Sequence, residues 1–323
     1  MSFTTYNAGD SVTNSEIVVT GLWTNNAYTL NTFATASGYT EYYLDVYNTG
    51  SGGVVQFDIQ YGSPSGSGSA PINAAVPSNT PSRIVYGQYR TLVYGVESSN
   101  FTFDGGVTYP NNIYVINISR ALYKESLLPG SLNLTLSGSG GKITLTDDSG
   151  TTNLTRFVGE NVYYNLIAGS NGSGSLSTIY GMFLPNISTI ILNGDLLASG
   201  SYITAASTGN TVVNNHLKLY NSIVLGNSFQ LSSSETLSST YFFTRITNSN
   251  YNYTSNPSIT DTNGNIIYNT LINNPQTFVT TVGLYNNNND LLAVAKLSKP
   301  LVKDFTKEAL IRVKIDYWFF III

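Results

Sequence analysis

The clearest pattern of hydrophobic and polar positions lies between Thr277 and Tyr317. Three apolar runs are separated there by an Asn-rich turn and a charged turn, which predicts a three-stranded antiparallel meander. In the last run every second residue from Ile311 to Tyr317 is apolar, as in a strand with one buried face and one wet face. The middle run, Leu291 to Leu297, is apolar on both faces, so we expect both of its faces to be covered.

Short apolar runs separated by turn residues continue through the rest of the chain. Residues 42–47 and 54–61 alternate and flank a Gly-rich turn, which predicts a hairpin. Residues 113–119 form a further strand candidate, and residues 132–136 and 142–146 flank another Gly-rich turn. Many short strands with frequent turns favour antiparallel β-sandwich-like domains. The predicted fold is therefore mainly β, with the C-terminal meander and few short helices.

Two segments have helical character, and a third divides the chain. Residues 83–97 carry long side chains at helical spacing, and residues 120–128 precede Pro129-Gly130, which predicts a helical turn. Residues 62–81 are rich in Gly, Ser and Pro and hold no charge. A structureless loop of that length is uncommon inside a compact domain, so this stretch is expected to be a linker or an arm that orders on a neighbouring subunit.

This stretch sets the predicted domain organisation. An N-terminal β region, residues 1–61, precedes it. A β-rich main region, residues 82–317, follows it and has room for two packed sandwiches. Residues 318–323 form an apolar C-terminal tail.

Composition adds further constraints. The chain of 323 residues contains no cysteine, which excludes disulfides, thiol chemistry and Cys-ligated metals. Only 10% of its residues are charged, against about 25% in ordinary soluble domains. A polar but uncharged surface suits side-chain hydrogen bonding between packed subunits, although a genome rich in Asn, Tyr and Ile codons is an alternative explanation. Because 41% of the residues are hydrophobic, disorder is not expected.

Six of the fourteen basic residues lie between positions 296 and 316, with three acids among them. Because the charges are interleaved and no nucleic-acid-binding motif accompanies them, a subunit contact or a solvated edge is favoured and no nucleic acid partner is expected. The lysines proposed for such contacts are Lys299, Lys303 and Lys307.

The apolar tail is a second candidate for intersubunit contact. It is too short to span a bilayer, which needs about 20 residues, and the start of the chain lacks the apolar segment of a signal peptide, so no membrane is expected as a partner. An exposed apolar end would invite pairing with another chain. The candidate contact residues of the tail are Trp318, Phe319, Phe320, Ile321, Ile322 and Ile323.

Candidate catalytic and metal-binding residues are few. The single histidine, His216, is expected to be a polar residue at a strand edge, because one histidine without cysteine does not make an ordinary zinc site. Asp147-Asp148 is the best carboxylate pair for acid–base chemistry or calcium, but its Thr-Asp-Asp-Ser-Gly context predicts a β-turn. Residues 261–265 imitate the start of a calcium loop without its closing glutamate and are better interpreted as a hairpin turn. We expect no enzymatic activity, no metal and no cofactor.

Several segments occur in an order that is typical of a known family. They are FTTYNAGDSVTNSEIVVTGLWTNN at 3–26, VVQFDIQYG at 54–62, SRIVYGQYRTLV at 82–93, IYVINISRALYKESLLPGSLNLTL at 113–136 and TFVTTVGLYNNNNDLLAVAKLSKPL at 277–301. Over nearly its full length the chain resembles virion structural proteins of contractile-tailed bacteriophages, the T-even-like viruses that infect marine cyanobacteria. The resemblance implies a place in the virion, assembled in the host cytoplasm, with other virion structural proteins as partners.

Three functions follow from these observations. The first is a structural subunit of the phage tail, at the baseplate or the neck, packed as a homo-oligomer in six-fold or twelve-fold symmetry. The alternative is a host-binding fibre or a capsid decoration protein, in which some of the 24 tyrosines would stack on glycans. Burial of the four tyrosines Tyr42, Tyr43, Tyr163 and Tyr164 would count against this alternative. A glycan-degrading enzyme is the third, and it would need two exposed carboxylates roughly 5–10 Å apart.

Overall fold

The computed structural model describes residues 5–35, 42–49, 53–68, 80–96, 100–103, 109–208, 214–254 and 256–318. The protein is mainly β, and it divides into two compact units. Unit 1 comprises residues 1–16 and 236–323, and unit 2 comprises residues 17–235. The boundaries expected from the sequence at 61, 81 and 317 do not coincide with these units, because the N-terminal residues fold with the C-terminal part of the chain.

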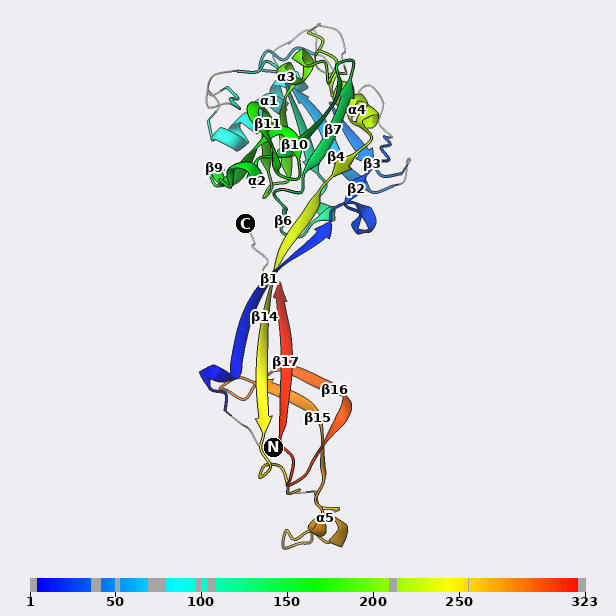
Figure 1. Cartoon of the computed structure of the whole chain (residues 1–323). Helices are drawn as coiled ribbons and strands as arrows, with labels where there is room; N and C mark the ends of the chain where they lie inside the picture. Colours follow the sequence, from blue (N-terminus) through cyan, green and yellow to red (C-terminus); the bar gives the residue numbers. More distant parts are fainter. Residues whose placement is uncertain are drawn as a thin grey trace. The chain divides into compact units, whose positions relative to one another are not determined.

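Unit 2 is built on one antiparallel sheet, which has eleven strands in the described part of the chain (Figure 1). The strand order is β2-β13-β7-β8-β10-β11-β12-β5-β4-β3, and β9 pairs with β10. The strands are β2 (Thr29–Leu30), β3 (Tyr43–Tyr47), β4 (Val55–Gly62), β5 (Ile113–Ile118), β7 (Asn133–Gly138), β8 (Gly141–Asp147), β9 (Arg156–Val158), β10 (Asn161–Ser170), β11 (Ser173–Leu184), β12 (Thr189–Asn193) and β13 (Phe229–Gln230). The hairpin predicted over residues 42–61 is confirmed as β3–β4, and the strands expected on either side of the second Gly-rich turn pair as β7–β8.

The sheet closes over its own inner face, which makes unit 2 sandwich-like. Phe57 on β4, near one end of the strand order, has its ring centroid 5.3 Å from that of Phe229 on β13, near the other end. The ring of Trp23 lies 6.0 Å from Phe57 and 4.8 Å from Phe229, and its indole N–H donates to the carbonyl of Phe229 at 2.9 Å. This aromatic cluster therefore joins strands that are far apart in the sheet.

Helices cover both faces of the sheet (Figure 1). The helices of unit 2 are α1 (Pro81–Tyr94), α2 (Ser149–Thr152), α3 (Gly194–Ser199) and α4 (Asn215–Gly226), with 3₁₀ turns at Thr24–Asn26 and Arg120–Leu122. Helix α1, predicted from its spacing, buries Val85, Tyr89 and Val93 four residues apart, which places them on one helix face. They pack on the outer face of the sheet, whereas Leu219 and Ile223 of α4 pack in the core on its inner face.

The helical turn predicted over residues 120–128 is present only at the start of that segment. The segment forms a single 3₁₀ turn and then strand β6 (Ser126–Leu127), which pairs with strand β14 (Ser232–Ile246). The Arg120 guanidinium donates to the carbonyls of Tyr123 and Lys124 at 2.5 and 2.6 Å. These carbonyls are thereby withdrawn from helical hydrogen bonding, and the helix ends after one turn.

The ends of the predicted arm, residues 62–81, belong to unit 2. Gly62 ends β4 and Pro81 begins α1. The Thr80 hydroxyl donates to the carbonyl of Gly66 at 2.6 Å, and the Asn215 side chain donates to that of Gly68 at 3.1 Å. Residues 62–68 are therefore ordered on their own chain and not on a neighbouring subunit, while residues 69–79 of the predicted linker or arm lie outside the described residues.

Unit 1 consists of two small sheets that share a thin core. One sheet has the order β1 (Ser11–Gly21), β14 and β17 (Ala309–Trp318), and the boundaries of the units fall within β1 and β14. The other is the hairpin of β15 (Thr277–Tyr285) and β16 (Leu291–Lys303). The buried apolar residues between them are Ile246, Leu284, Ile311 and Val313. The described part of this unit also contains a 3₁₀ turn, Ala8–Asp10, and helix α5, Asn269–Asn273.

The three strands predicted between 277 and 317 are present, but the predicted meander is wrong. Strand β15 pairs with β16, whereas β17 pairs with β14, from Leu237 opposite Trp318 to Ile246 opposite Ala309. The alternating apolar face of β17 packs against the hairpin instead of lying beside it. Face-to-face packing buries that apolar face, which edge-to-edge pairing with β16 would not do.

Candidate interaction surface

Unit 1 exposes more apolar side chains than it buries. Among the described residues, unit 1 has four buried and sixteen exposed large hydrophobic residues, whereas unit 2 has forty buried and fourteen exposed. A buried aliphatic or aromatic side chain contributes about 1.5–3 kcal/mol, and ordering one residue of backbone costs about 1–2 kcal/mol. The core of unit 1 is therefore small for its length, and contact with another surface is expected to stabilise it.

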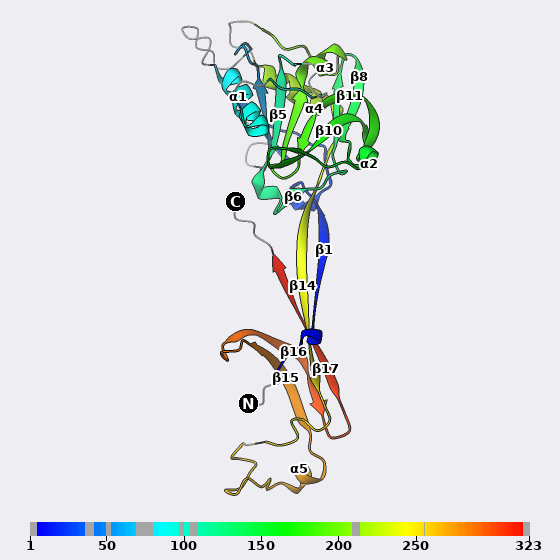
Figure 2. The same cartoon turned by 90° about the vertical axis from the view of Figure 1, so that its left-hand side faces the viewer.

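Four of these exposed residues gather at the turn end of the β15–β16 hairpin. We define the hairpin patch as Tyr285, Leu291, Leu292 and Val294, which are 38, 52, 67 and 57% exposed. Tyr285 lies opposite Leu291 in the register, and Gly283 lies opposite Val294. In Figure 2 the turn end of the hairpin projects to the side of the β14–β17 pair. The patch is thus one continuous apolar area on a projecting element.

The turn that closes the hairpin is held by local hydrogen bonds. The Asn286 side-chain oxygen accepts from the backbone N–H groups of Asn288 and Asp290 at 2.9 and 2.8 Å, and its amide donates to the Asp290 carboxylate at 2.9 Å. Asn289 has φ 65°, a left-handed conformation that Asn adopts more readily than most residues. The Asn-rich turn predicted from the sequence is confirmed, and it fixes the patch in place.

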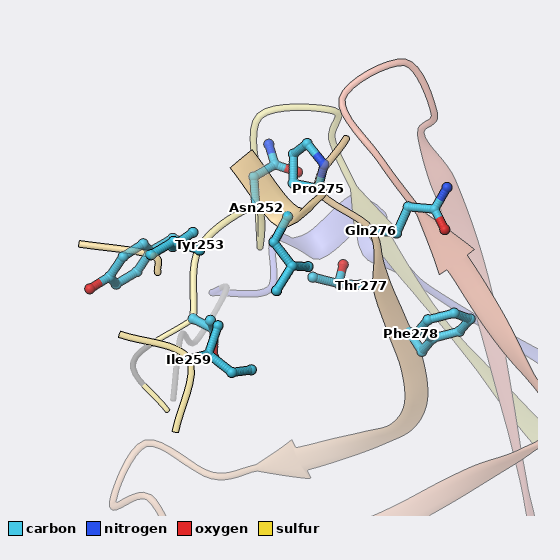
Figure 3. Close-up of a pocket in the computed structure, with 10 residues that line it drawn as sticks. Asn252, Tyr253, Ile259, Pro275, Gln276, Thr277 and Phe278 are labelled. Atoms are coloured by element: carbon cyan, nitrogen blue, oxygen red, sulfur yellow. The ribbon is translucent and has the colours of Figure 1, made fainter. Parts of the chain in front are cut away.

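A pocket of about 210 Å³ lies at the opposite end of β15 (Figure 3). Its walls include Tyr253, Ile259, Leu271 and Phe278, and none of its lining residues is charged. The hydroxyl of Thr277, which also lines the pocket, is buried and has no hydrogen-bond partner among the described residues. Unit 1 therefore carries the hairpin patch at one end of β15 and an uncharged pocket at the other end.

The three candidate lysines have different environments. Lys299 is exposed on β16, and Lys307 is exposed with its ammonium 3.1 Å from the Asp304 carboxylate. Lys303 is only 1% exposed, which contradicts its predicted role as an intersubunit contact. Its ammonium donates to the backbone carbonyls of Asn248, at 3.0 Å, and Asn250, and to the side-chain oxygen of Asn252. Lys303 thus forms hydrogen bonds within its own chain, which anchor the loop after β14.

Replacing Lys303 by Met is expected to destabilise this loop by about 2 kcal/mol, because charge-assisted hydrogen bonds to three oxygens are lost. Lys299→Met, on the same strand but exposed, is the control and is expected to change stability by less than about 0.5 kcal/mol. Hydrogen exchange of residues 248–252 measures the effect, and the exchange should be faster in Lys303→Met only. Equal exchange rates in the two variants would contradict the anchoring role.

The apolar tail is described only at its first residue. Trp318 ends β17, opposite Leu237 in the register. The other five residues, Phe319, Phe320, Ile321, Ile322 and Ile323, lie outside the described residues. Their role as intersubunit contacts stays a prediction.

The carboxylate pair Asp147-Asp148 is fully buried and engaged by the surrounding chain. Asp147 accepts the backbone N–H of Gly130 at 2.9 Å, and burial raises the pKa of its carboxyl group. Asp148 accepts the N–H of Asn165 at 3.0 Å and forms an ion pair with Arg156 at 2.8 Å. The segment leads into α2, so the pair organises a helical turn where the sequence predicts a β-turn. Neither carboxylate is exposed to a substrate.

The other candidate ligands have structural roles. Asp261 accepts the backbone N–H groups of Asn263 and Asn265 at 2.9 and 2.7 Å, and Thr260 lies opposite Ile266 in an antiparallel bridge, so the predicted hairpin turn is confirmed. Within the described ranges, no group of three or more His, Asp or Glu residues could hold a metal ion. No helix of the described part is long and apolar enough to cross a membrane.

His216 lies in the first turn of α4 and not at a strand edge, as its sequence context predicts. It is 2% exposed, and its Nε2 atom has no hydrogen-bond partner in the described part of the chain. Burial lowers the pKa of its imidazole to about 4, because the charged form would lose its hydration. The imidazole is therefore neutral in the folded chain at pH 7.

The stability of unit 2 is expected to fall as the pH is lowered from 7 to 4. His216 takes up a proton in the unfolded chain near its ordinary pKa of 6.5, but in the folded chain only near 4, so protonation favours unfolding. The loss attributable to His216 reaches about 3 kcal/mol at pH 4. Urea unfolding followed by Trp23 fluorescence in a Trp318→Phe background measures it. His216→Gln should show a pH dependence smaller by this amount, and identical pH dependences would contradict the prediction.

The four tyrosines that distinguish the glycan-binding alternative do not share one environment. Tyr164 is buried, Tyr43 and Tyr163 are half-buried, and Tyr42 is 46% exposed. Only Tyr42 of this set is therefore exposed. The observation gives no specific support to a glycan-binding face at these positions.

Comparison with protein-family models, with curated proteins and with solved structures finds no match to the chain. The site must therefore be interpreted from its own geometry. Sequence reasoning missed the hairpin patch as a surface, although the run Leu291 to Leu297 contained the signal. Its apolar residues on both faces predicted burial of both faces, but Leu292 and Val294 stand exposed on one of them. One face of this run is therefore exposed where the sequence predicted burial.

Proposed function

We propose that the chain is a structural subunit of a tailed-bacteriophage virion, which acts by subunit packing at the tail baseplate or the neck. The observation that carries this proposal is the hairpin patch on a unit whose described part buries only four large apolar residues. A unit with so small a core gains most from an assembled environment, where neighbouring subunits cover its apolar surface. The resemblance of the sequence to virion proteins of contractile-tailed phages supplies the biological setting.

Uncharged polar pairing supports the same proposal. Inside unit 1, the hydroxyls of Thr13 and Thr240 lie 3.2 Å apart, and those of Ser15 and Ser238 lie 3.1 Å apart. Strands are thus joined by hydroxyl ladders, which do not depend on charge. Surfaces of this composition pack against other virion proteins and further copies of the chain without strong repulsion. This role requires no catalytic residue, cofactor or nucleic acid.

Immunogold electron microscopy of intact virions, with antibody against this chain, tests the proposal. Label at the distal end of the tail is expected for a baseplate subunit, and label at the head–tail junction for a neck subunit. Label along fibres or over the head would replace this role with host binding or capsid decoration. Absence of the polypeptide from purified particles would overturn the proposal.

A further inference from the structure

We propose that the hairpin patch of one copy of this chain inserts into the pocket of a second copy, so that neighbouring copies join head to tail through unit 1. The proposal rests on the proposed function, since both require assembly through unit 1. It goes further by naming the partner and the two surfaces in contact. Both surfaces are present on every copy, which is the first reason to choose a second copy as the occupant.

The patch cannot reach the pocket of its own chain. Phe278, at the start of β15, lines the pocket, and Tyr285, at the end of β15, belongs to the patch. Seven residues of extended strand separate them by about 23 Å, at about 3.3 Å per residue. Strand β16 pairs with β15 at both ends of this stretch, with an irregularity between Val279 and Thr281. The patch and the pocket of one chain therefore do not cover each other, whereas a second copy offers each surface its counterpart.

The two surfaces match in chemistry and in size. The patch is apolar, and the pocket is lined by uncharged residues such as Ile259, Leu271 and Phe278. An apolar cavity of about 150 Å³ accommodates a benzene molecule. The pocket, at about 210 Å³, therefore has room for the side chain of Leu292, the most exposed residue of the patch at 67%.

Charge also favours contact between copies at unit 1. Residues 1–16 and 236–323 contain seven basic and seven acidic residues, whereas residues 17–235 contain seven basic and eleven acidic residues. Two copies of unit 1 therefore meet without net repulsion, while two surfaces of unit 2 would meet as like charges. The neutral unit is also the one with the uncovered apolar surface.

A contact between two different surfaces has a consequence for the assembly. Patch-to-pocket contact is heterologous, so each copy presents one free patch and one free pocket until the series closes. Such contacts produce closed rings when the rotation between copies divides a full turn, and filaments when it does not. A ring is the form that matches the six-fold or twelve-fold symmetry expected of a phage tail.

Because the chain contains no cysteine, single cysteine variants test the contact directly. Full-length chains that carry Leu292→Cys are mixed with full-length chains that carry Ile259→Cys, oxidised and separated on a non-reducing gel. We expect a cross-linked dimer from the mixture and none from either variant alone. A dimer from Leu292→Cys alone would mean that patch meets patch, and this would overturn the head-to-tail contact. Absence of a dimer from the mixture would overturn it as well.

Light scattering of the full chain provides a second measurement. Leu292→Asp is expected to reduce the average mass toward the 34.9 kDa of a single chain. Leu225→Asp, at an exposed position on α4 of unit 2, is the matched control and should keep the mass of the unmodified chain. Val294→Asp repeats the test at a second patch position, and circular dichroism checks that each variant is folded. An unchanged mass in both folded patch variants overturns this contact but leaves the proposed function standing, because that function is tested separately by the place of the chain in virions.

Discussion

Replacing Phe57 by Ala is expected to lower the free energy of unfolding of unit 2 by about 3–5 kcal/mol. Phe57 is fully buried, and its ring lies 6.0 Å from Trp23, 6.5 Å from Phe33 and 5.3 Å from Phe229, centroid to centroid. These neighbours come from separate parts of the chain that meet where the sheet closes on itself. They cannot collapse together without moving whole strands, so the substitution leaves a cavity in addition to the lost burial.

Phe157→Ala is the matched control for this substitution. Phe157 lies on β9 of the same unit and is 67% exposed, so its loss is expected to change stability by less than about 0.5 kcal/mol. Urea unfolding followed by Trp23 fluorescence, in a Trp318→Phe background, reports on both variants. Similar losses in the two would mean that the aromatic cluster does not hold the sheet closed.

This closure is the part of unit 2 that the sequence did not reveal. The alternation of residues 42–47 and 54–61 predicted a hairpin, because local period and turn chemistry determine which neighbouring strands pair. The contact between Phe57 and Phe229 joins residues far apart in the chain, and many other arrangements satisfy the same pattern. Period therefore predicted the strands and the mainly β class, but not the order of the strands in the sheet.

The C-terminal region shows the same limit more sharply. The apolar face of β17 was evident from the sequence, and residues of that face, Ile311 and Val313, are buried. The neighbour of β17 was not evident, because an alternating strand specifies a buried face but not the strand at its edge. Lys303 was predicted to be a subunit contact from the cluster of basic residues between 296 and 316, and the pattern could not show that its acceptors lie in a distant loop. The hairpin patch was visible as an apolar run, but only its exposure reveals it as a surface.

Replacing Arg156 by Met is expected to lower the stability of unit 2 by about 3–5 kcal/mol, because it leaves a buried carboxylate without its cation. Asp148 is fully buried, and its ion pair with Arg156 at 2.8 Å is supplemented by the N–H of Asn165 at 3.0 Å. Without the guanidinium, the buried carboxylate loses its counter-charge and keeps the Asn165 N–H as a partner, which destabilises the turn into α2. Asp148, one of the two candidate acid–base carboxylates, therefore has a structural role in this interpretation.

The control for Arg156 is Lys124, which pairs with Glu235 at 3.3 Å and has a side chain that is 64% exposed. Lys124→Met is expected to cost less than Arg156→Met, since water screens the charge of the exposed Lys124, although the Glu235 side chain is only 14% exposed. The same Trp23 unfolding measurement compares the two variants, and equal losses would contradict a special role for the buried pair. A large loss of stability for Arg156→Met alone would show that Asp148 serves the folded structure. No catalytic role is then needed to account for this aspartate.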